Sequence, residues 1–456
     1  MLLSMISVPH AYHYLASSAL LEEARPHLSL ATSSVGERDH PYFFEGRVRQ
    51  PRLIAELLTT IQVVVGSRFF TPANSLARLI ALADPVVTAG GGRLRFEGFS
   101  SCCSAYIRAD LLPDSYDGNL VGKGTTNVDF NPPMRAALAR VRDANGLSLS
   151  IGRDELALRS GATEIVEKKV ALPLRWIRGM VEVQSYQASM RKRLQVTGHE
   201  ALRFFRSLPK AATSRTPLWV VAGPFGPRTT TREEAHAVRL VDTSRLRVLE
   251  SLLPRALSMS VYADVANQAS AWILEFAGAR ITLVISAEVW RGFSGEGQAL
   301  RTLIKASTVH CLAEVRASLQ WQALIRPDQL ATALGQPKEE VEDALRILGA
   351  SGLTGYDIAE ASYFHRELPF DLSAVDDMHP RLAGARKLLD EDAVRIIKAS
   401  PLEAAVTSAQ VEQRVRAVDG ELRCTCPWFA KHQGLRGPCK HVLAVEVLAG
   451  EGNAPI

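Results

Sequence analysis

Four cysteine and histidine residues near the carboxyl end constrain this 456-residue chain more than any other feature of its sequence. They form two close pairs, Cys424 with Cys426 and Cys439 with His441, separated by twelve residues. Three thiols and one imidazole are the ligand types and the ligand number of a closed tetrahedral zinc site. A catalytic zinc keeps one position open, whereas four such ligands fill the shell. The spacing predicts a structural Zn2+ ion on these four residues, with His432 in the spacer as the alternative imidazole.

The flanking sequence predicts how the ligands are presented. Residues 411–418 and 421–424 alternate like two paired strands, with an Asp-Gly dipeptide between them that suits a type I′ hairpin turn. In a strand, residues i and i+2 point to one face, so we expect Cys424 and Cys426 to direct both sulfur atoms to the same point. Downstream, residues 441–448 are apolar and predict a helix. Because about 40 residues form only a small core, we expect zinc to be needed for this unit to fold.

A Cys-x-Cys pair, a spacer and a Cys-x-His pair, with a hairpin before and a helix after, resemble the SWIM zinc finger over residues 411–449. Upstream, residues 96–103 and 124–131 resemble uncharacterised bacterial SWIM zinc finger proteins. The resemblance implies a module that binds DNA or protein and does not catalyse a reaction. Genes of such proteins are often found near those of MoxR-type AAA ATPases and von Willebrand factor A proteins. The resemblance therefore implies a protein partner of that kind.

Basic and aromatic residues surround the ligands, and no acidic residue occurs from 422 to 445. The basic residues are Arg423, Lys431, Arg436 and Lys440. Part of their charge offsets the net negative charge of three thiolates on one zinc ion. The remainder, together with Trp428, suits contact with phosphates and stacking on a base of single-stranded or irregular nucleic acid. In the alternative interpretation, Trp428 and Phe429 form the small core of the finger.

Residues 321–372 predict a winged-helix-like module. Helices at 328–334 and 338–348 are joined by a three-residue turn with a glycine, and two strands follow, which is the element order of a winged helix. The second helix carries four acidic residues where a groove-reading helix meets phosphates: Glu339, Glu340, Glu342 and Asp343. Because like charges cost affinity for nucleic acid, this pattern favours a structural or protein-binding winged helix over a DNA reader.

The sequence as a whole predicts a multidomain α+β protein. Its length and its hydrophobic content of 47% suit about three folded domains. Residues 1–127 indicate a mixed α/β region. Residues 128–320 contain three loosely similar units of strand, helix and two strands, which predict a sheet-and-helix body with internal β-α-β-β repeats, of the general kind seen in sliding clamps. Residues 373–400 predict a helical connector, and residues 401–456 the zinc finger.

Individual elements outside the finger are also predicted. Apolar periodicity indicates helices at 51–65, 73–82 and 299–319. Three consecutive glycines at 90–92 predict a hairpin turn between two strands, because glycine adopts the positive φ angles that a tight reversal needs.

Composition and motifs limit the function. The longest apolar stretch falls short of the roughly 20 residues of a membrane helix, and residues 1–21 lack the basic residues of a secretory signal, so we expect a cytoplasmic protein without a membrane partner. We find no nucleophile–base or paired-carboxylate arrangement. We therefore expect a non-catalytic zinc-binding protein whose finger mediates protein or nucleic-acid interaction, as an adaptor in an AAA ATPase-associated system. The alternatives are a DNA-binding protein that uses both finger and winged helix, and an enzyme with its site in residues 1–320.

Overall fold

The computed structural model describes most of the chain. The described residues are 19–21, 27–30, 32–33, 42–69, 85–119, 123–128, 132–152, 174–209, 218–287, 292–293, 297, 299–304, 309–368, 379–434 and 436–451. The helix predicted at residues 73–82 lies outside them. In the part of the chain that the structure describes, no helix is long and apolar enough to cross a membrane.

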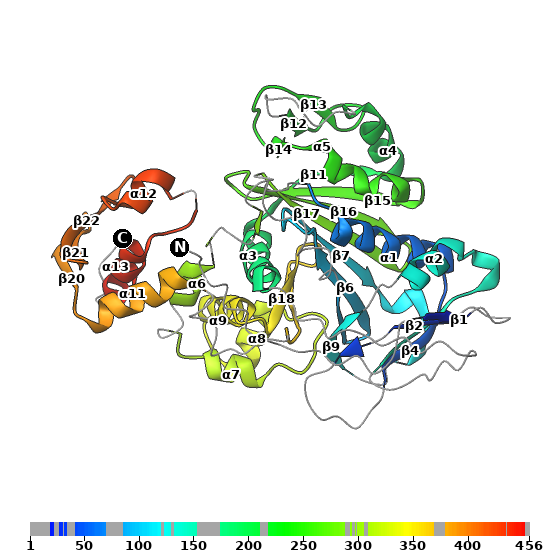
Figure 1. The fold of residues 1–456 in the computed structure, drawn as a ribbon, viewed down its shortest axis with the longest axis horizontal. Helices are drawn as coiled ribbons and strands as arrows, with labels where there is room; N and C mark the ends of the chain where they lie inside the picture. Colours follow the sequence, from blue (N-terminus) through cyan, green and yellow to red (C-terminus); the bar gives the residue numbers. More distant parts are fainter. Residues whose placement is uncertain are drawn as a thin grey trace.

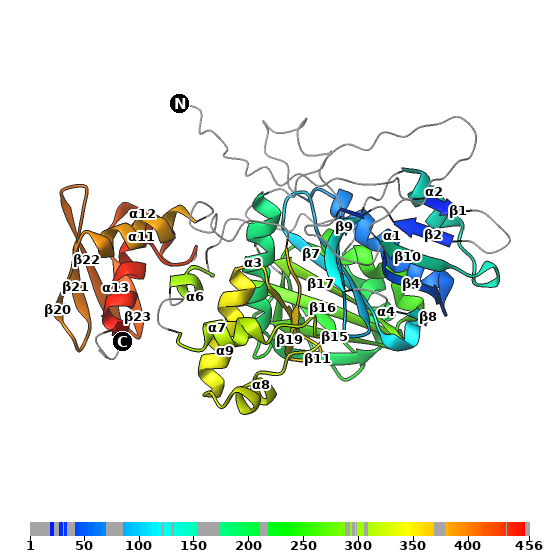
Figure 2. The same ribbon diagram turned by 90° about the horizontal axis from the view of Figure 1, so that it is seen from below.

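A nine-stranded antiparallel sheet forms the centre of the molecule (Figures 1 and 2). Its strands, in order across the sheet, are β11 (Arg191–Thr197), β15 (Ser258–Ala263), β16 (Ala269–Phe276), β17 (Ala279–Ser286), β7 (Ala105–Leu111), β6 (Arg93–Phe99), β5 (Val86–Gly90), β9 (Gly124–Val128) and β3 (Thr32–Ser33). Gly91 and Gly92, with φ angles of 55° and 78°, form the tight turn between β5 and β6 that the glycine run predicts.

The central strands of this sheet have one apolar and one charged face. In β6, Phe96 is buried on the side covered by α1 (Pro51–Gly66), which begins and ends close to the predicted bounds. Arg95 points to the opposite side, because successive residues of a strand alternate between the faces. α4 (Gly198–Ser207) packs on β15, and the 3-10 helix Arg247–Arg255 packs against both α4 and α1.

Two smaller sheets flank the large one. The strand order in the first is β1 (Ala19–Leu21), β2 (His27–Leu30), β10 (Ser148–Gly152), β4 (Tyr42–Val48) and β8 (Tyr116–Asn119). The strand order in the second is β13 (Arg228–Thr230), β12 (Leu218–Val221) and β14 (Val238–Leu240). The predicted repeat units supply strands to these sheets unequally. The first unit contains the helix α2 (Pro132–Arg140), and its strands β9 and β10 lie in different sheets. The second unit contains α4, and its strands β11 and β12 also lie in different sheets. The third unit contains α5 (Thr243–Leu246). The three units therefore do not share one strand pairing.

The segment after residue 298 forms a helical layer against the charged face of the sheet. Within the described residues, the predicted helix 299–319 is two separate helices, α6 (Leu300–Ile304) and α7 (Leu312–Ala317). The helices and strands predicted for residues 328–367 are present as α8 (Pro327–Leu334), α9 (Lys338–Ala350), β18 (Thr354–Asp357) and β19 (Ser362–His365). α3 (Leu174–Ser189) contacts both α9 and β18, so it fixes this layer to the body.

A network of buried charges joins the β18–β19 hairpin to the sheet. The Asp357 carboxylate, with a fully buried side chain, lies 3.1 Å from guanidinium nitrogens of both Arg108 and Arg280. It also lies 3.7 Å from Arg95 and 3.8 Å from Arg93. The four guanidinium groups face four carboxylates in all: Asp110, Glu275, Asp357 and Glu360. The charges balance, and this hairpin is held on the sheet by ion pairs that the solvent does not screen.

The carboxyl-terminal unit contains a four-stranded antiparallel sheet with three helices, and lies at the left of Figure 1. Its elements are α11 (Pro380–Asp390), β20 (Val394–Lys398), β21 (Glu403–Ser408), β22 (Val411–Val418), β23 (Glu421–Cys424), α12 (Pro427–His432) and α13 (Lys440–Glu451). α11 packs along α13, and both contact α6 of the body. The sheet thus begins upstream of residue 401, and its apolar core is continuous with Leu300 and Leu303 of α6.

Candidate metal centre

The four predicted ligands meet in one buried cluster. The ligand atoms of Cys424, Cys426, Cys439 and His441 all lie within 4.8 Å of one another. The His441 Nδ1 atom is 3.8 Å from the Cys424 sulfur and 4.0 Å from the Cys439 sulfur. Tetrahedral zinc places its sulfur and nitrogen ligands about 3.5–3.8 Å apart. The donor set and the spacing therefore fit a zinc ion with little adjustment.

The hairpin presents the first ligand as the sequence predicts. β22 and β23 pair in antiparallel register, with Val415 opposite Cys424. The turn residues Asp419 and Gly420 have φ angles of 54° and 78°, which is the left-handed conformation that a type I′ turn needs.

The second ligand lies just beyond the end of the predicted strand. β23 ends at Cys424, and Cys426 is the N-cap residue of α12, where its sulfur accepts a hydrogen bond from the Phe429 amide at 3.4 Å. The backbone of Cys426 is still extended, with φ −67° and ψ 152°, and α12 begins directly after it, so both sulfurs reach one point as the i, i+2 spacing predicts. α12 is not among the helices predicted from the sequence, although Pro427 after a capping residue is a common helix start.

The second ligand pair lies at the start of α13. Cys439 precedes the helix and its sulfur accepts a hydrogen bond from the Val442 amide at 3.4 Å, while His441 is in the first turn. This arrangement agrees with the predicted helix at 441–448. Amides at a helix N-terminus favour a thiolate over a thiol.

The hydrogen bond between Cys424 and Cys439 shifts the pKa values of these two thiols in opposite directions. A hydrogen bond from the Cys424 thiol, assisted by His441, lowers the pKa of Cys439 to about 4. The same bond, together with burial, raises the pKa of Cys424 far above its ordinary value, and burial raises the pKa of Cys426. Zinc coordination needs all three thiolates, and a divalent cation compensates their mutual repulsion.

The aromatic residues near the ligands pack into the protein. Trp428 is half-buried; the Arg381 guanidinium lies over its ring, with Cζ 4.6 Å from the ring centroid. Trp428 also contacts His432, with the two ring centroids 4.8 Å apart. His432, the alternative imidazole ligand, is not part of the four-residue cluster. Phe429 also packs against the apolar core. These contacts agree with the core interpretation of Trp428 and Phe429.

The basic residues near the ligands are distributed around the finger. Arg423 is exposed and lies 3.7 Å from Asp419. Lys431 is exposed, whereas Arg436 and Lys440 are half-buried. The stem of Lys440 lies against α11 at Gly384.

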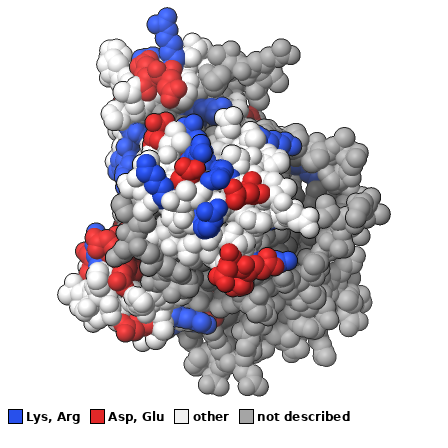
Figure 3. All heavy atoms as spheres, turned by 90° about the vertical axis from the view of Figure 1, so that its left-hand side faces the viewer, with Lys and Arg blue, Asp and Glu red and all other residues white. Residues whose placement is uncertain are grey.

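The outer face of the finger sheet, formed by β20 to β23, carries interleaved charges (Figure 3). Arg414 lies 2.9 Å from Glu412, and Arg416 lies 3.0 Å from Glu403. Arg395 lies 3.6 Å from Glu412. These three arginines thus already have acidic neighbours.

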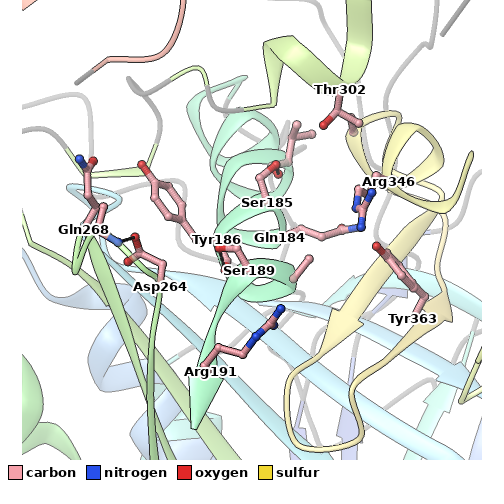
Figure 4. A pocket seen from close by; sticks show the side chains of 14 residues that line it. Gln184, Ser185, Tyr186, Ser189, Arg191, Asp264, Gln268, Thr302, Arg346 and Tyr363 are labelled. Atoms are coloured by element: carbon pink, nitrogen blue, oxygen red, sulfur yellow. Dashed lines mark hydrogen bonds between the residues drawn. The ribbon is translucent and has the colours of Figure 1, made fainter. Parts of the chain in front are cut away.

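A cavity of about 510 Å³ lies between α3, the β15–β16 turn, α6 and α9 (Figure 4). Polar side chains line it, including Gln184, Arg191 and Tyr363. Arg346, which faces the cavity, donates hydrogen bonds to Asp343 at 2.7 Å and to Glu342 at 2.9 Å. The lining therefore has no dominant charge that would select one class of ligand.

Comparison with known proteins identifies the metal centre. Residues 414–450 match the family model of the SWIM zinc finger. No protein among those with curated descriptions matches the sequence.

Two crystal structures of sliding clamps show weak similarity to the fold. The Proliferating Cellular Nuclear Antigen from Entamoeba histolytica is 9% identical, with a TM-score of 0.33 over 54% of this chain and 98% of that one. The C. crescentus beta sliding clamp is 14% identical, with a TM-score of 0.32 over 54% of this chain and 65% of that one. No functional conclusion rests on these two similarities. The family match and the buried cluster together show that residues 414–450 form a SWIM zinc finger on Cys424, Cys426, Cys439 and His441, and that its cofactor is Zn2+.

Proposed function

We propose that this chain is a non-catalytic zinc protein whose SWIM finger binds a protein partner, as an adaptor in a larger system. The outer face of the finger sheet carries this proposal. Paired charges there, as at Arg416 and Glu403, leave little net attraction for phosphates. One exposed apolar side chain, Val418 of β22, lies on the same face as Arg414 and Arg416, because alternate residues of a strand share a face. Apolar groups among paired charges suit a protein surface better than a nucleic-acid backbone.

The closed metal site supports a structural role for zinc. Three sulfurs and one imidazole nitrogen converge on one point, and all four residues are buried. A catalytic zinc needs a position for water or substrate, which a filled tetrahedral shell does not provide. The zinc ion then stabilises the fold of the surface that binds the partner, and we propose that the chain is not an enzyme.

The winged-helix-like module supports the same interpretation. α9 begins with acidic residues, of which Glu339 is exposed, so it repels phosphates. The β18–β19 hairpin, which corresponds to the wing, contacts Arg108 and Arg280 of the large sheet through Asp357. A wing engaged in this way is not free to contact DNA. We propose that the module is structural or protein-binding.

The family resemblance suggests the class of partner. We propose a cytoplasmic AAA ATPase of the MoxR type or a von Willebrand factor A protein, as implied for bacterial SWIM zinc finger proteins. The alternatives are a DNA-binding protein, for which Lys431 is an exposed basic residue near the finger, and an enzyme in residues 1–320. The cavity beside α3, which residues within 1–320 line together with Arg346, Ala350 and Tyr363, is where an enzyme of that kind would hold a small substrate.

Affinity capture with the full-length tagged chain tests this proposal. We expect the partner to remain bound after nuclease treatment and to change little between about 50 and 200 mM salt, whereas a protein with 6–10 phosphate contacts loses affinity about 10³- to 10⁵-fold in this range. Val418→Asp should abolish capture, because it replaces the exposed apolar side chain of this face by a charge. Lys431→Gln, on an exposed residue away from that sheet, should leave capture unchanged. Release by nuclease, or loss with Lys431→Gln alone, would favour nucleic acid.

A further inference from the structure

The two ligand pairs of the zinc site lie on different segments of the chain. Cys426 starts the short helix α12, and Cys439 follows residues 433–434 and 436–438, which belong to no helix. Within this stretch, the Gly437 amide bonds to the Gly434 carbonyl at 2.9 Å, and Gly437 also forms an isolated β-bridge and lies against the Gly297 backbone. Contacts from outside the stretch help to hold Cys439 in place against Cys424 and Cys426.

Arg381, in the first turn of α11, provides such a contact. Its Nη1 atom donates hydrogen bonds to the Arg436 carbonyl at 2.7 Å and to the Pro438 carbonyl at 2.9 Å. The Pro438 carbonyl belongs to the peptide group that leads directly into Cys439. A charged donor makes stronger hydrogen bonds than a neutral one, and these two act on the same segment.

The same guanidinium also reaches the other ligand segment. It lies over the ring of Trp428, with Cζ 4.6 Å from the centroid, and Trp428 is in the first turn of α12 after Cys426. Arginine suits this double contact because its planar group stacks on an aromatic ring while its edge donates hydrogen bonds.

The packing around Arg381 is close. A Cβ atom at Gly297 would clash with Arg381 Nη2, and one at Gly437 would clash with the Gly297 carbonyl oxygen. The body of the protein, the ligand stretch and Arg381 therefore meet with no room for side chains between them.

We propose that Arg381 is a positioning residue of the zinc centre, which joins the segment of Cys439 to the segment of Cys426 from a helix outside the finger sequence. The inference concerns metal retention and depends on the zinc centre, not on the proposed partner. Residues that orient the ligands of a metal typically change its affinity or retention about 10- to 100-fold when they are replaced.

Zinc transfer from the full-length protein to an excess of a chromogenic chelator tests the proposal. We expect Arg381→Gln to release zinc about 10- to 100-fold faster than the wild type. Arg381→Lys should fall between them, because an ammonium group reaches one carbonyl and does not stack as a plane. Lys387→Gln is the matched control: this exposed residue of the same helix lies 3.6 Å from Glu391, and its loss should not change the rate.

Cobalt substitution provides a readout that a general loss of stability does not produce. We expect the visible absorption of the Co2+-loaded Arg381→Gln protein to shift, because the ligands take up a different geometry. Should Arg381→Gln fail to fold, Arg381→Lys and Trp428→Leu serve instead, since each removes only part of the contact. Release of zinc at the wild-type rate in folded variants, or equal acceleration by Lys387→Gln, would overturn the proposal. Partner capture is measured in a separate experiment. A failure of the Arg381 proposal therefore leaves the proposed protein-binding function standing, and the reverse also holds.

Discussion

Replacing Cys439 by alanine is expected to reduce bound zinc from about one ion per chain to almost none. The change removes the ligand whose thiolate is most favoured and opens the coordination shell. Cys311→Ala is the matched control, because Cys311 is also a buried free thiol but lies outside the cluster. Metal analysis of the purified proteins by mass spectrometry measures the difference. Full zinc retention by Cys439→Ala would contradict the assignment of this residue as a ligand.

Loss of zinc should have a local effect on structure. The finger core continues into α6 and α11, so its apolar contacts are more extensive than the sequence of the finger alone suggests. We expect hydrogen exchange in Cys439→Ala to increase most between residues 424 and 441, and least in β21 and in the second half of α13. Equal exchange throughout residues 394–451 would show instead that zinc holds the entire unit.

Asp357→Asn is expected to destabilise the full chain by about 3–5 kcal/mol, the usual cost of removing one partner from a buried ion pair. The carboxylate faces four guanidinium groups, and its side chain is 0% exposed. Glu234→Gln is the matched control, because Glu234 forms an exposed ion pair with Arg228 at 3.1 Å, and such pairs contribute at most about 1 kcal/mol. Urea unfolding followed by fluorescence measures both. Similar midpoints for the two variants would show that the buried network contributes little.

The same network predicts a dependence on pH. Burial by itself would raise the pKa of Asp357, but the guanidinium groups of Arg108, Arg280 and Arg95 outweigh it and hold the pKa well below its ordinary value. A depressed pKa in the folded state stabilises the protein at a pH above the unfolded value of about 3.9, and this contribution is lost as the pH falls below it. We expect Asp357→Asn to lose less stability than the wild type between about pH 5 and pH 3. If both proteins lost the same stability over this pH range, the Asp357 carboxylate would not be the source of the pH dependence.

Several elements could be predicted from the sequence because their causes are local. The hairpin β22–β23 follows from alternation on both sides of Asp419-Gly420, and α8 and α9 follow from apolar periodicity around a turn. The four ligands follow from the chemistry and the spacing of thiols and imidazole. Each of these signals lies within a few residues of the structure it specifies.

Contacts between distant segments could not be predicted in this way. Strand β6 alternates apolar and charged residues, as a strand with one solvent-exposed face does, yet Arg95 is buried because Asp357 lies above it, far along the chain. Trp428 has the sequence context of a base-stacking residue, but Arg381 covers its ring.

The sequence by itself determined the metal, its four ligands and the hairpin and helix that carry them, because coordination chemistry and turn geometry depend on short-range spacing. Only the tertiary structure decided that α11, β20 and α6 complete the finger and that the β18–β19 hairpin is held on the sheet. These arrangements depend on which charged and apolar surfaces meet when the chain folds, and the partners involved are separated by as many as 269 residues, as in the hydrogen bond from Arg366 to Glu97.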